Sequence, residues 1–236
     1  MTTKKPTGNI RDKKGIRTRE TITRAARKVF SEYPYHTASM RMIGKEAGIE
    51  HPLINYYFPS KARLFETVTT EICSEFISRN EEWFDEIRNL RITDALTSYI
   101  DRLLDYNAEN PEPLRLLALN ITQAEHITQI PGYQQFPDLI EKIQQLFMKI
   151  IPIKSTAQQV SIYINSFVFL AIALLGSSPC VAQVQGMEPG SDQFREWLRS
   201  ALNMIFLPPL KDIINIQVNT AGGQKKNPSS KASLKP

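Results

Sequence analysis

The sequence contains few of the residues that build metal sites and disulfide frameworks. Its 236 residues include two cysteines and three histidines. Cys73 and Cys180 stand far apart and match no metal-ligand spacing, and His36, His51 and His126 are scattered along the chain. We therefore expect free thiols and no metal site, which is the usual state of a protein in a reducing cytoplasm.

Long apolar runs are also lacking. The longest, Phe167–Leu175, is too short to cross a bilayer, which takes about 20 residues. The first segment, Met1–Lys14, is polar and basic and has no apolar core of the kind found in secretory signals. These features predict a cytoplasmic protein without a membrane partner.

No residue set typical of catalysis stands out in the sequence. We find no Ser-His-Asp group, no Gly-rich phosphate loop and no closely spaced cysteine pair. We therefore expect a protein that is not an enzyme and that needs no cofactor.

Positive charge is concentrated at one end of the chain. Residues 1–63 contain 14 Lys or Arg and 5 Asp or Glu, whereas residues 64–236 contain 15 and 19. A basic segment joined to a mildly acidic one is typical of a nucleic-acid-binding module with a separate partner domain. A basic, disordered N-terminus without a partner would give the same imbalance, so charge alone does not decide.

Helical periodicity dominates, and no alternating run indicates a strand. A first helix is predicted over Thr18–Glu32. A second is predicted to begin after Ser39, which caps it, and to end at Gly48, where positive φ costs little. Pro52 suits the first turn of a third, which runs to about Phe58. The apolar stripe of the first helix consists of Ile22, Ala25, Ala26, Val29 and Phe30.

The rest of the chain predicts six longer helices, so we expect an all-α protein of about nine helices. The first of the six, capped by Ser60, is expected to close the core of the three short helices. Thr93-Asp94 is expected to cap the second, a capping box at Thr156 to open the fifth, and Pro208-Pro209 to end the last. The predicted ranges are 61–87, 94–108, 114–127, 137–151, 156–175 and 191–207.

The segment from Ser39 to Phe58 has the pattern of a helix-turn-helix. In this motif a first helix braces a second, whose N-terminal side chains meet base edges in the major groove of DNA. The apolar residues expected to fix the crossing are Met40, Ile43, Ala47, Ile49, Ile54 and Phe58. The residues left facing outward are Arg41, Lys45, His51, Asn55, Tyr56 and Tyr57. Exposed tyrosines beside Lys and Arg suit phosphate and sugar contacts, although both would also fit the core of a helical hairpin.

Over residues 16–68 the sequence resembles the N-terminal domain of TetR-type repressors. The landmarks are a first helix ending in Phe30, then Ser39-Met-Arg-x-Ile-Gly-x-Glu-Ala-Gly-Ile, then Ile-Asn-Tyr-Tyr-Phe-x-Ser-Lys-x-x-Leu-Phe65. The resemblance implies a homodimeric, ligand-responsive regulator, usually a repressor, that binds a palindromic double-stranded DNA operator. It implies an unidentified small-molecule effector that releases the DNA.

The resemblance also implies roles for individual residues. Arg41 matches a position that often reads guanine, because a guanidinium fork fits its O6 and N7. His51 and Pro52 match the start of the recognition helix, where base contacts are usual. The positions that match phosphate contacts are Thr37, Ser39, Tyr56, Tyr57 and Lys61.

The sequence departs from the family pattern at three places. Asn55 stands where Tyr is commonest, and because Asn can bond adenine in two places, it is expected to read a base. Tyr57 stands where His is commonest, and Pro59 replaces a residue that is usually polar. The basic residues around Arg11 and Lys14 are expected to form either an arm that touches DNA or a mobile solubilising leader.

Four regions are expected from these observations and from the resemblance. They are a disordered basic leader (1–15), a helix-turn-helix domain (16–65), a helical effector-binding and dimerisation domain (66–218) and a disordered tail (219–236). In the third region, polar residues in apolar settings are candidates for an effector pocket, although each would also fit the surface. They are Tyr99, Arg102, Tyr106, Asn120, Gln123, His126 and Tyr163.

Two strongly apolar helices are expected to pair across a two-fold axis into a four-helix interface, unless both belong to the core of a monomer. The candidate interface residues are Ile164, Phe167, Val168, Ala171, Leu174, Phe194, Trp197, Leu198, Ala201, Leu202 and Ile205. The alternative function that the sequence leaves open is a helical protein-interaction adaptor with a basic end.

Overall fold

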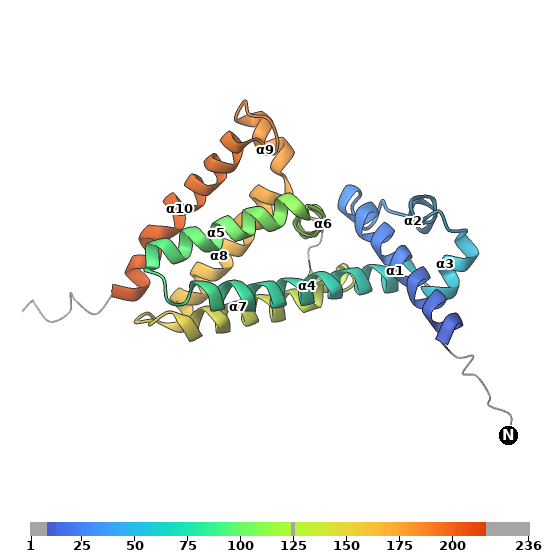
Figure 1. The fold of residues 1–236 in the computed structure, drawn as a ribbon, viewed down its shortest axis with the longest axis horizontal. Coiled ribbons are helices and arrows are strands. Elements are labelled where there is room, and N and C mark those ends of the chain that lie inside the picture. The colour runs from blue at the N-terminus through green and yellow to red at the C-terminus, as the bar shows by residue number, and fades with distance from the viewer. Residues whose placement is uncertain (1–8, 124–125, 216–236) are drawn as a thin grey trace, which may run out of the picture.

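A computed structural model describes residues 9–123 and 126–215 of the chain. Every regular element in this part is helical, which confirms the predicted all-α class. It contains ten α-helices and two 3-10 turns, and the helices form a small N-terminal unit and a larger C-terminal one (Figure 1). The tail predicted for residues 219–236 lies outside the described residues.

The N-terminal unit is built from α1 (Asn9–Glu32), α2 (Met40–Ala47), α3 (His51–Tyr57) and the start of α4 (Lys61–Ile87). The boundaries of the last three agree with the prediction, but α1 begins nine residues earlier than the predicted Thr18. Residues 9–15 are therefore helical and do not belong to a disordered leader. Their side chains are almost all polar, so the apolar periodicity used for the prediction does not register them.

The C-terminal unit surrounds α8 (Ala157–Gly176), which packs against three other helices, α6 (Glu112–Ile121), α7 (Phe136–Ile150) and α10 (Asp192–Asn215). The long α4 runs from the N-terminal unit along the whole lower side of this domain (Figure 1). The remaining elements are α5 (Ile92–Glu109), the turns η1 (Ile127–Gln129) and η2 (Tyr133–Gln135), and α9 (Ser178–Val184).

By length and composition α8 could cross a membrane. In the structure one face of α8 lies in the core, with Val160, Ile164, Phe167 and Leu175 buried, whereas Ile162 and Phe169 are exposed. Its place between neighbouring helices accounts for the apolarity of the buried face.

Four predictions about the C-terminal unit are wrong. The last helix does not end at Pro208-Pro209 but continues to Asn215, because its buried stripe runs on through Leu210 and Ile213. The predicted loop 176–190 contains α9, and α6 ends at Ile121, six residues earlier than expected. The cap of α5 is Arg91, and Asp94 instead binds the Arg91 side chain, with Nε to Oδ2 2.9 Å.

Candidate nucleic-acid interface

The core of the N-terminal unit forms as its apolar pattern predicts. Ile22, Ala26 and Phe30 of α1 are fully buried against Ile43 of α2 and Ile54 of α3. The start of α4 closes this core, as predicted, because Phe65 is buried and its ring meets the edge of Phe30 with centroids 4.7 Å apart. Packing of the buried faces of α2 and α3 against α1 and α4 fixes the angle at which α3 stands to α2.

Two glycines make the turn between α2 and α3 possible. Gly48 has φ of 64°, in the left-handed region that favours glycine, and ends α2 as predicted. A Cβ on Gly44 would lie 2.9 Å from the Ile49 carbonyl oxygen and 3.2 Å from Ile54 Cδ1. Any side chain there would push α3 away from α2, so both glycines set the helix crossing.

The polar face of α2 and α3 is open to solvent. Arg41, His51, Pro52 and Asn55 are all exposed, and Tyr56 is 80% exposed. Asn55 Nδ2 lies 3.4 Å from His51 Nδ1, so these two side chains support each other on one face of α3. These five residues, which we call the α3 reading face, form one surface at the end of the molecule.

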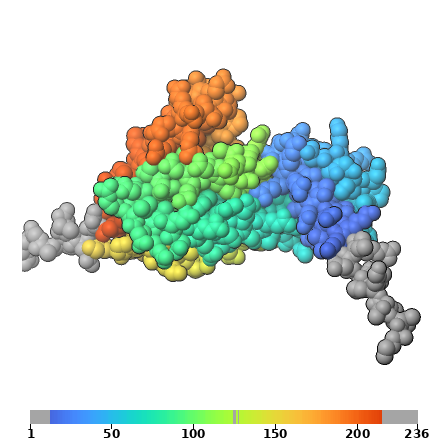
Figure 2. All heavy atoms as spheres, in the orientation of Figure 1, coloured from blue at the N-terminus to red at the C-terminus, as the bar shows by residue number. Residues whose placement is uncertain are grey.

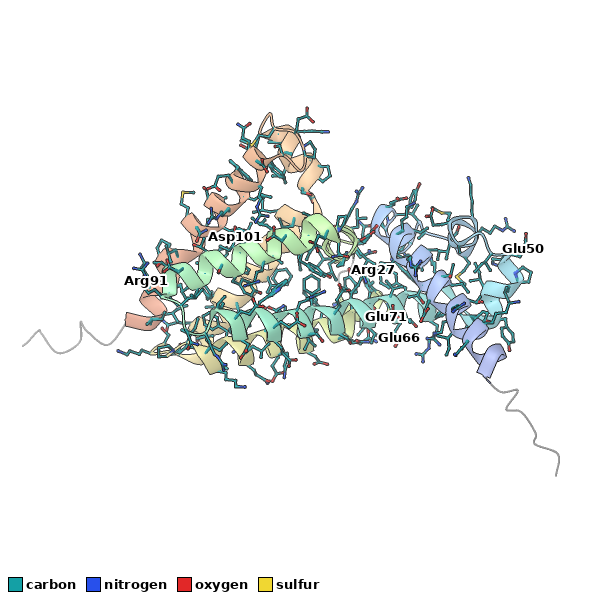
Figure 3. All side chains as sticks on the ribbon, in the orientation of Figure 1. Arg27, Glu50, Glu66, Glu71, Arg91 and Asp101 are labelled. Carbon is teal, nitrogen blue, oxygen red and sulfur yellow. The ribbon has the colours of Figure 1, made fainter. Side chains whose placement is uncertain are left out.

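An open groove adjoins the α3 reading face. It is lined by residues of α2, the turn and the start of α3, and has a volume of about 430 Å³. Its charged or polar lining residues are Arg41, Lys45, Glu50 and His51. Glu50 lies at the outer tip of the domain (Figure 3), where a carboxylate can accept a bond from cytosine N4.

Sequence reasoning missed two exposed residues of this surface, Glu50 and Leu53. Leu53 is 45% exposed although apolar. The sequence carries a signal that could have identified Leu53. Ile54 marks the buried face of α3, and the preceding residue, Leu53, lies about 100° around the helix from it. An exposed Leu there suits contact with a thymine methyl group.

Three of the predicted phosphate contacts have internal partners. The Ser39 hydroxyl accepts a bond from the Met42 N–H at 3.3 Å, and its own O–H remains available to donate. Tyr57 is half-buried, with its ring edge-on to Tyr56 at 5.2 Å. Thr37 is exposed.

Lys61 is the third predicted phosphate contact that has internal partners, and its surroundings differ most from the expectation. Its ammonium donates to the carbonyl oxygens of Tyr35 at 2.7 Å, Ala38 at 2.9 Å and His36 at 3.4 Å. It also lies over the Tyr35 ring, 4.5 Å from the centroid, and burial lowers its pKa. Lys61 thus ties the start of α4 to the connection between α1 and α2, and its phosphate contact stays a prediction.

The N-terminal end of α1 extends the basic surface towards α3. A Cβ on Gly15 would lie 3.7 Å from the Tyr57 hydroxyl, so this end of α1 lies beside the end of α3 (Figure 1). Lys13, Lys14 and Arg17 are exposed on it. Arg19 lies over the Phe58 ring, 4.9 Å from its centroid.

Two of the residues predicted for an effector pocket are brought together, and the other five lie elsewhere. Tyr99 and Tyr163 line a cavity in the C-terminal core. Arg102 pairs with Glu86, and Gln123 and His126 are exposed.

The other two predicted pocket residues make internal bonds near the domain junction. The Tyr106 hydroxyl donates to Glu75 Oε1 at 2.7 Å. Asn120 is fully buried, and its Oδ1 accepts the Tyr35 N–H at 2.7 Å.

The predicted dimer interface contains residues of the chain's own core. Six of the eleven are buried in the core of the single chain and so offer little surface to a second copy, namely Ile164, Phe167, Ala171, Phe194, Leu198 and Leu202. Val168, Leu174, Trp197 and Ala201 are half-buried, and Ile205 is 45% exposed. The six buried residues fit the alternative stated above, in which the two apolar helices belong to the core of a monomer.

The braced pair of short helices, with a polar face open at the end of the molecule, is a helix-turn-helix, the reading unit of many transcriptional regulators. Residues 22–68 match the model of the bacterial regulatory proteins of the tetR family. This match covers the N-terminal unit and supports a TetR-family transcriptional regulator.

Relatives of known name support this placement. The chain is 26% identical over 103 residues to the transcriptional regulator RutR of Escherichia coli, covering 44% of this chain and 47% of RutR. It is 32% identical over 118 residues to the transcriptional repressor NicS of Pseudomonas putida, covering 50% and 55%. The matches span about half the length of these curated relatives.

The fold extends beyond the matched part. The regulator FadR of Bacillus subtilis, solved in complex with stearoyl-CoA, superposes with a TM-score of 0.56 at 17% identity, over 83% of this chain and 97% of FadR. At this identity the likeness concerns the fold alone. It shows that the C-terminal helices are arranged as in this solved regulator.

Proposed function

We propose that this chain is a ligand-responsive, DNA-binding repressor that holds a palindromic operator as a homodimer. The observation that carries the proposal is the α3 reading face, a group of exposed side chains on α2 and α3, which are braced by a buried core at one end of the molecule (Figure 2). Exposing an aromatic ring to water is unfavourable, and Tyr56 is 80% exposed. Such exposure suits a surface that binds a partner. In the cytoplasm, DNA supplies the phosphates and base edges that this face fits.

The residues of this face have different roles in the proposal. Arg41, at the start of α2, reads a guanine, and His51 and Asn55 read neighbouring bases from α3. Tyr56 and Thr37 bond to phosphates, which position the helix without reading sequence. Lys61 acts indirectly, by holding the connection before α2 in place.

A second copy of the chain covers an apolar face of the C-terminal unit. Ile162 and Phe169 of α8 are 60% and 45% exposed, and Met204 and Ile205 of α10 are 74% and 45% exposed. A groove of about 380 Å³ between the two helices includes Ile162 and Ile205. Paired across a two-fold axis, α8 and α10 form a four-helix interface, which sets two copies of α3 into successive major grooves about 34 Å apart.

Two connections carry a change in the C-terminal unit to the DNA-binding helices. Asn120 of α6 holds the backbone of Tyr35, just after α1. Arg27 of α1 binds Glu75 of α4 at 2.8 Å, and Glu75 also accepts from Tyr106 of α5. Figure 3 shows Arg27 at this junction between the two units. An effector that prefers a shifted α6 therefore lowers DNA affinity by its difference in binding energy, typically ~1–3 kcal/mol.

The proposal is tested by the binding of the full-length protein to DNA upstream of its own gene, followed by fluorescence anisotropy. We expect the logarithm of the affinity to fall linearly with the logarithm of the salt concentration, because phosphate contacts release counterions. The variant Tyr56→Phe should bind all sequences more weakly. Arg88→Ala, an exposed arginine at the far end of α4, serves as the control and should bind as the wild type does.

The measurement also separates the alternatives. Binding that is absent for every DNA tested, or that does not change with salt, contradicts the proposal. Retained binding to an acidic protein surface without any DNA binding would favour the adaptor.

A further inference from the structure

Two small cavities lie next to each other in the core of the C-terminal unit, with volumes of about 50 Å³ and about 40 Å³. Both are lined by Tyr99, Ile143, Phe167 and Val168. The two cavities therefore adjoin at these four side chains, and a ligand that displaces them would join the two into a single space.

The cavities follow each other along α8. Tyr163 and Ile164 line the first, and Ala171 and Ile172 line the second. From Ile164 to Ile172 the helix rises about 12 Å, at 1.5 Å for each residue. The joined space is therefore elongated, and it runs beside the central helix of the domain.

The walls are almost entirely apolar. Among the described residues that line either cavity, none is Lys, Arg, His, Asp or Glu, and the polar ones are Tyr99, Tyr163 and Asn80. Their bonds are internal: the Tyr99 hydroxyl donates to Asn80 Oδ1 at 2.6 Å, and the Tyr163 hydroxyl donates to the Phe206 carbonyl at 3.3 Å. Burial raises the pKa of both tyrosines, so both hydroxyls stay protonated.

A charged ligand would lose its hydration in this space without meeting a charge of opposite sign, which is strongly unfavourable. An uncharged apolar ligand loses nothing of this kind and gains from burial. A single polar group on it could bond to the free lone pairs of the Tyr99 hydroxyl.

We infer that these two cavities are the effector site and that they take an elongated, uncharged, largely aliphatic molecule. The inference rests on the proposed function, and it also explains how the signal starts. The second cavity is bounded by Leu114 and Leu117 of α6, the helix that carries Asn120 and its bond to Tyr35. The cavities of about 50 Å³ and about 40 Å³ are smaller than the ~150 Å³ cavity that holds benzene. A long aliphatic chain therefore enters only if the lining helices, α6 among them, move apart.

The test measures binding to the full-length protein without DNA, by calorimetry and by the fluorescence of Trp83, whose ring meets Tyr99 edge-on at 5.8 Å. The probes are decanol, decanoate and decylammonium, which share a chain and differ in the charge of the head group. We expect decanol to bind and the two ions to bind at least about tenfold more weakly. Equal binding of an ion, or no binding of decanol, would overturn the inference.

Two substitutions test whether the ligand spans both cavities. Ala95 lines only the first and Ala171 only the second, and each is replaced by leucine, with the exposed Ala108→Leu as control. We expect each filling variant to weaken decanol about tenfold, since overpacking costs roughly 1.4 kcal/mol or more, and the control to have no effect. If only one variant binds decanol more weakly, the ligand does not span both cavities and the elongated site is refuted. If both variants bind decanol as the wild type does, the site itself is refuted. If a filling variant does not fold, the comparison of head groups in the wild type still decides.

The two proposals fail separately. If decanol binds as expected while the protein binds no DNA, the site stands and the regulatory function is wrong. If the protein binds DNA with the expected salt dependence while decanol does not bind, the ligand class is wrong and the regulatory function stands.

Discussion

The bond between Asn120 and Tyr35 allows a quantitative prediction about the junction of the two units. Asn120 is fully buried and makes two bonds, accepting the Tyr35 N–H at 2.7 Å and donating to the Leu116 carbonyl at 2.9 Å. Asn120→Ala leaves the Tyr35 N–H without its partner, at a cost of about 1–3 kcal/mol for a donor removed from water. Loss of the bond to Leu116 adds about 0.5–1 kcal/mol.

A matched control isolates the bond between the units. Asn165 donates to the Ser161 carbonyl one helical turn earlier, at 2.7 Å, as Asn120 does to Leu116, but Asn165 holds no backbone from the other unit. The difference between Asn120→Ala and Asn165→Ala should therefore be about 2 kcal/mol, mostly the Tyr35 bond.

Differential scanning calorimetry checks this value. For a chain of this size, about 2 kcal/mol corresponds to a melting temperature lower by about 4–8 °C in Asn120→Ala than in Asn165→Ala. Equal melting temperatures for the two variants would refute the reasoning, because the bond to Tyr35 would then contribute nothing to stability.

Four further predictions concern other parts of the molecule. Arg41→Ala should lose about 1–3 kcal/mol of DNA affinity, mainly at one base position, and a uniform loss over all operator variants would disprove base reading. Gly48→Ala should cost about 1–2 kcal/mol in thermal unfolding, because φ there is 64°, and an unchanged stability would disprove the strain. Ile162→Glu should give a monomer in analytical ultracentrifugation, and a retained dimer would exclude this face. At pH 8 a thiol reagent should label the exposed Cys180 quickly and Cys73 only after unfolding, because burial raises the pKa of Cys73 to about 11; fast labelling of both would contradict the packing.

The N-terminal helices could be predicted closely because the signals that define them are local. Ser39 and Ser60 each accept a bond from an N–H three residues later, and Gly48 adopts the positive φ that its type allows. Each of these signals acts within four residues of the boundary that it sets. The start of α1 lacked such a signal and was missed.

The end of α10 could not be predicted from local signals because tertiary packing overrides them. Two prolines inside a helix remove hydrogen bonds, at about 3 kcal/mol for one proline. Beyond them, however, Leu210 and Ile213 are buried, and the Ile213 carbonyl accepts bonds from the Lys154 N–H and the Ser155 hydroxyl. Only the folded chain shows that these gains lie within reach of the helix.

The residues predicted for the interface and for the effector site lie in different surroundings from those expected, for a common physical reason. Periodicity identifies the side chains that leave water but not the surface that covers them, and within one chain the strongest stripe, such as Phe194 and Leu198, is covered first. The stripe of α8 that the chain leaves exposed contains Ile162 and Phe169, and this is the stripe that we propose a second copy covers. In the same way, buried polar residues bond to one another, as Asn120 does, so the cavities keep apolar walls, and the ligand class that we propose follows from the absence of charge on them.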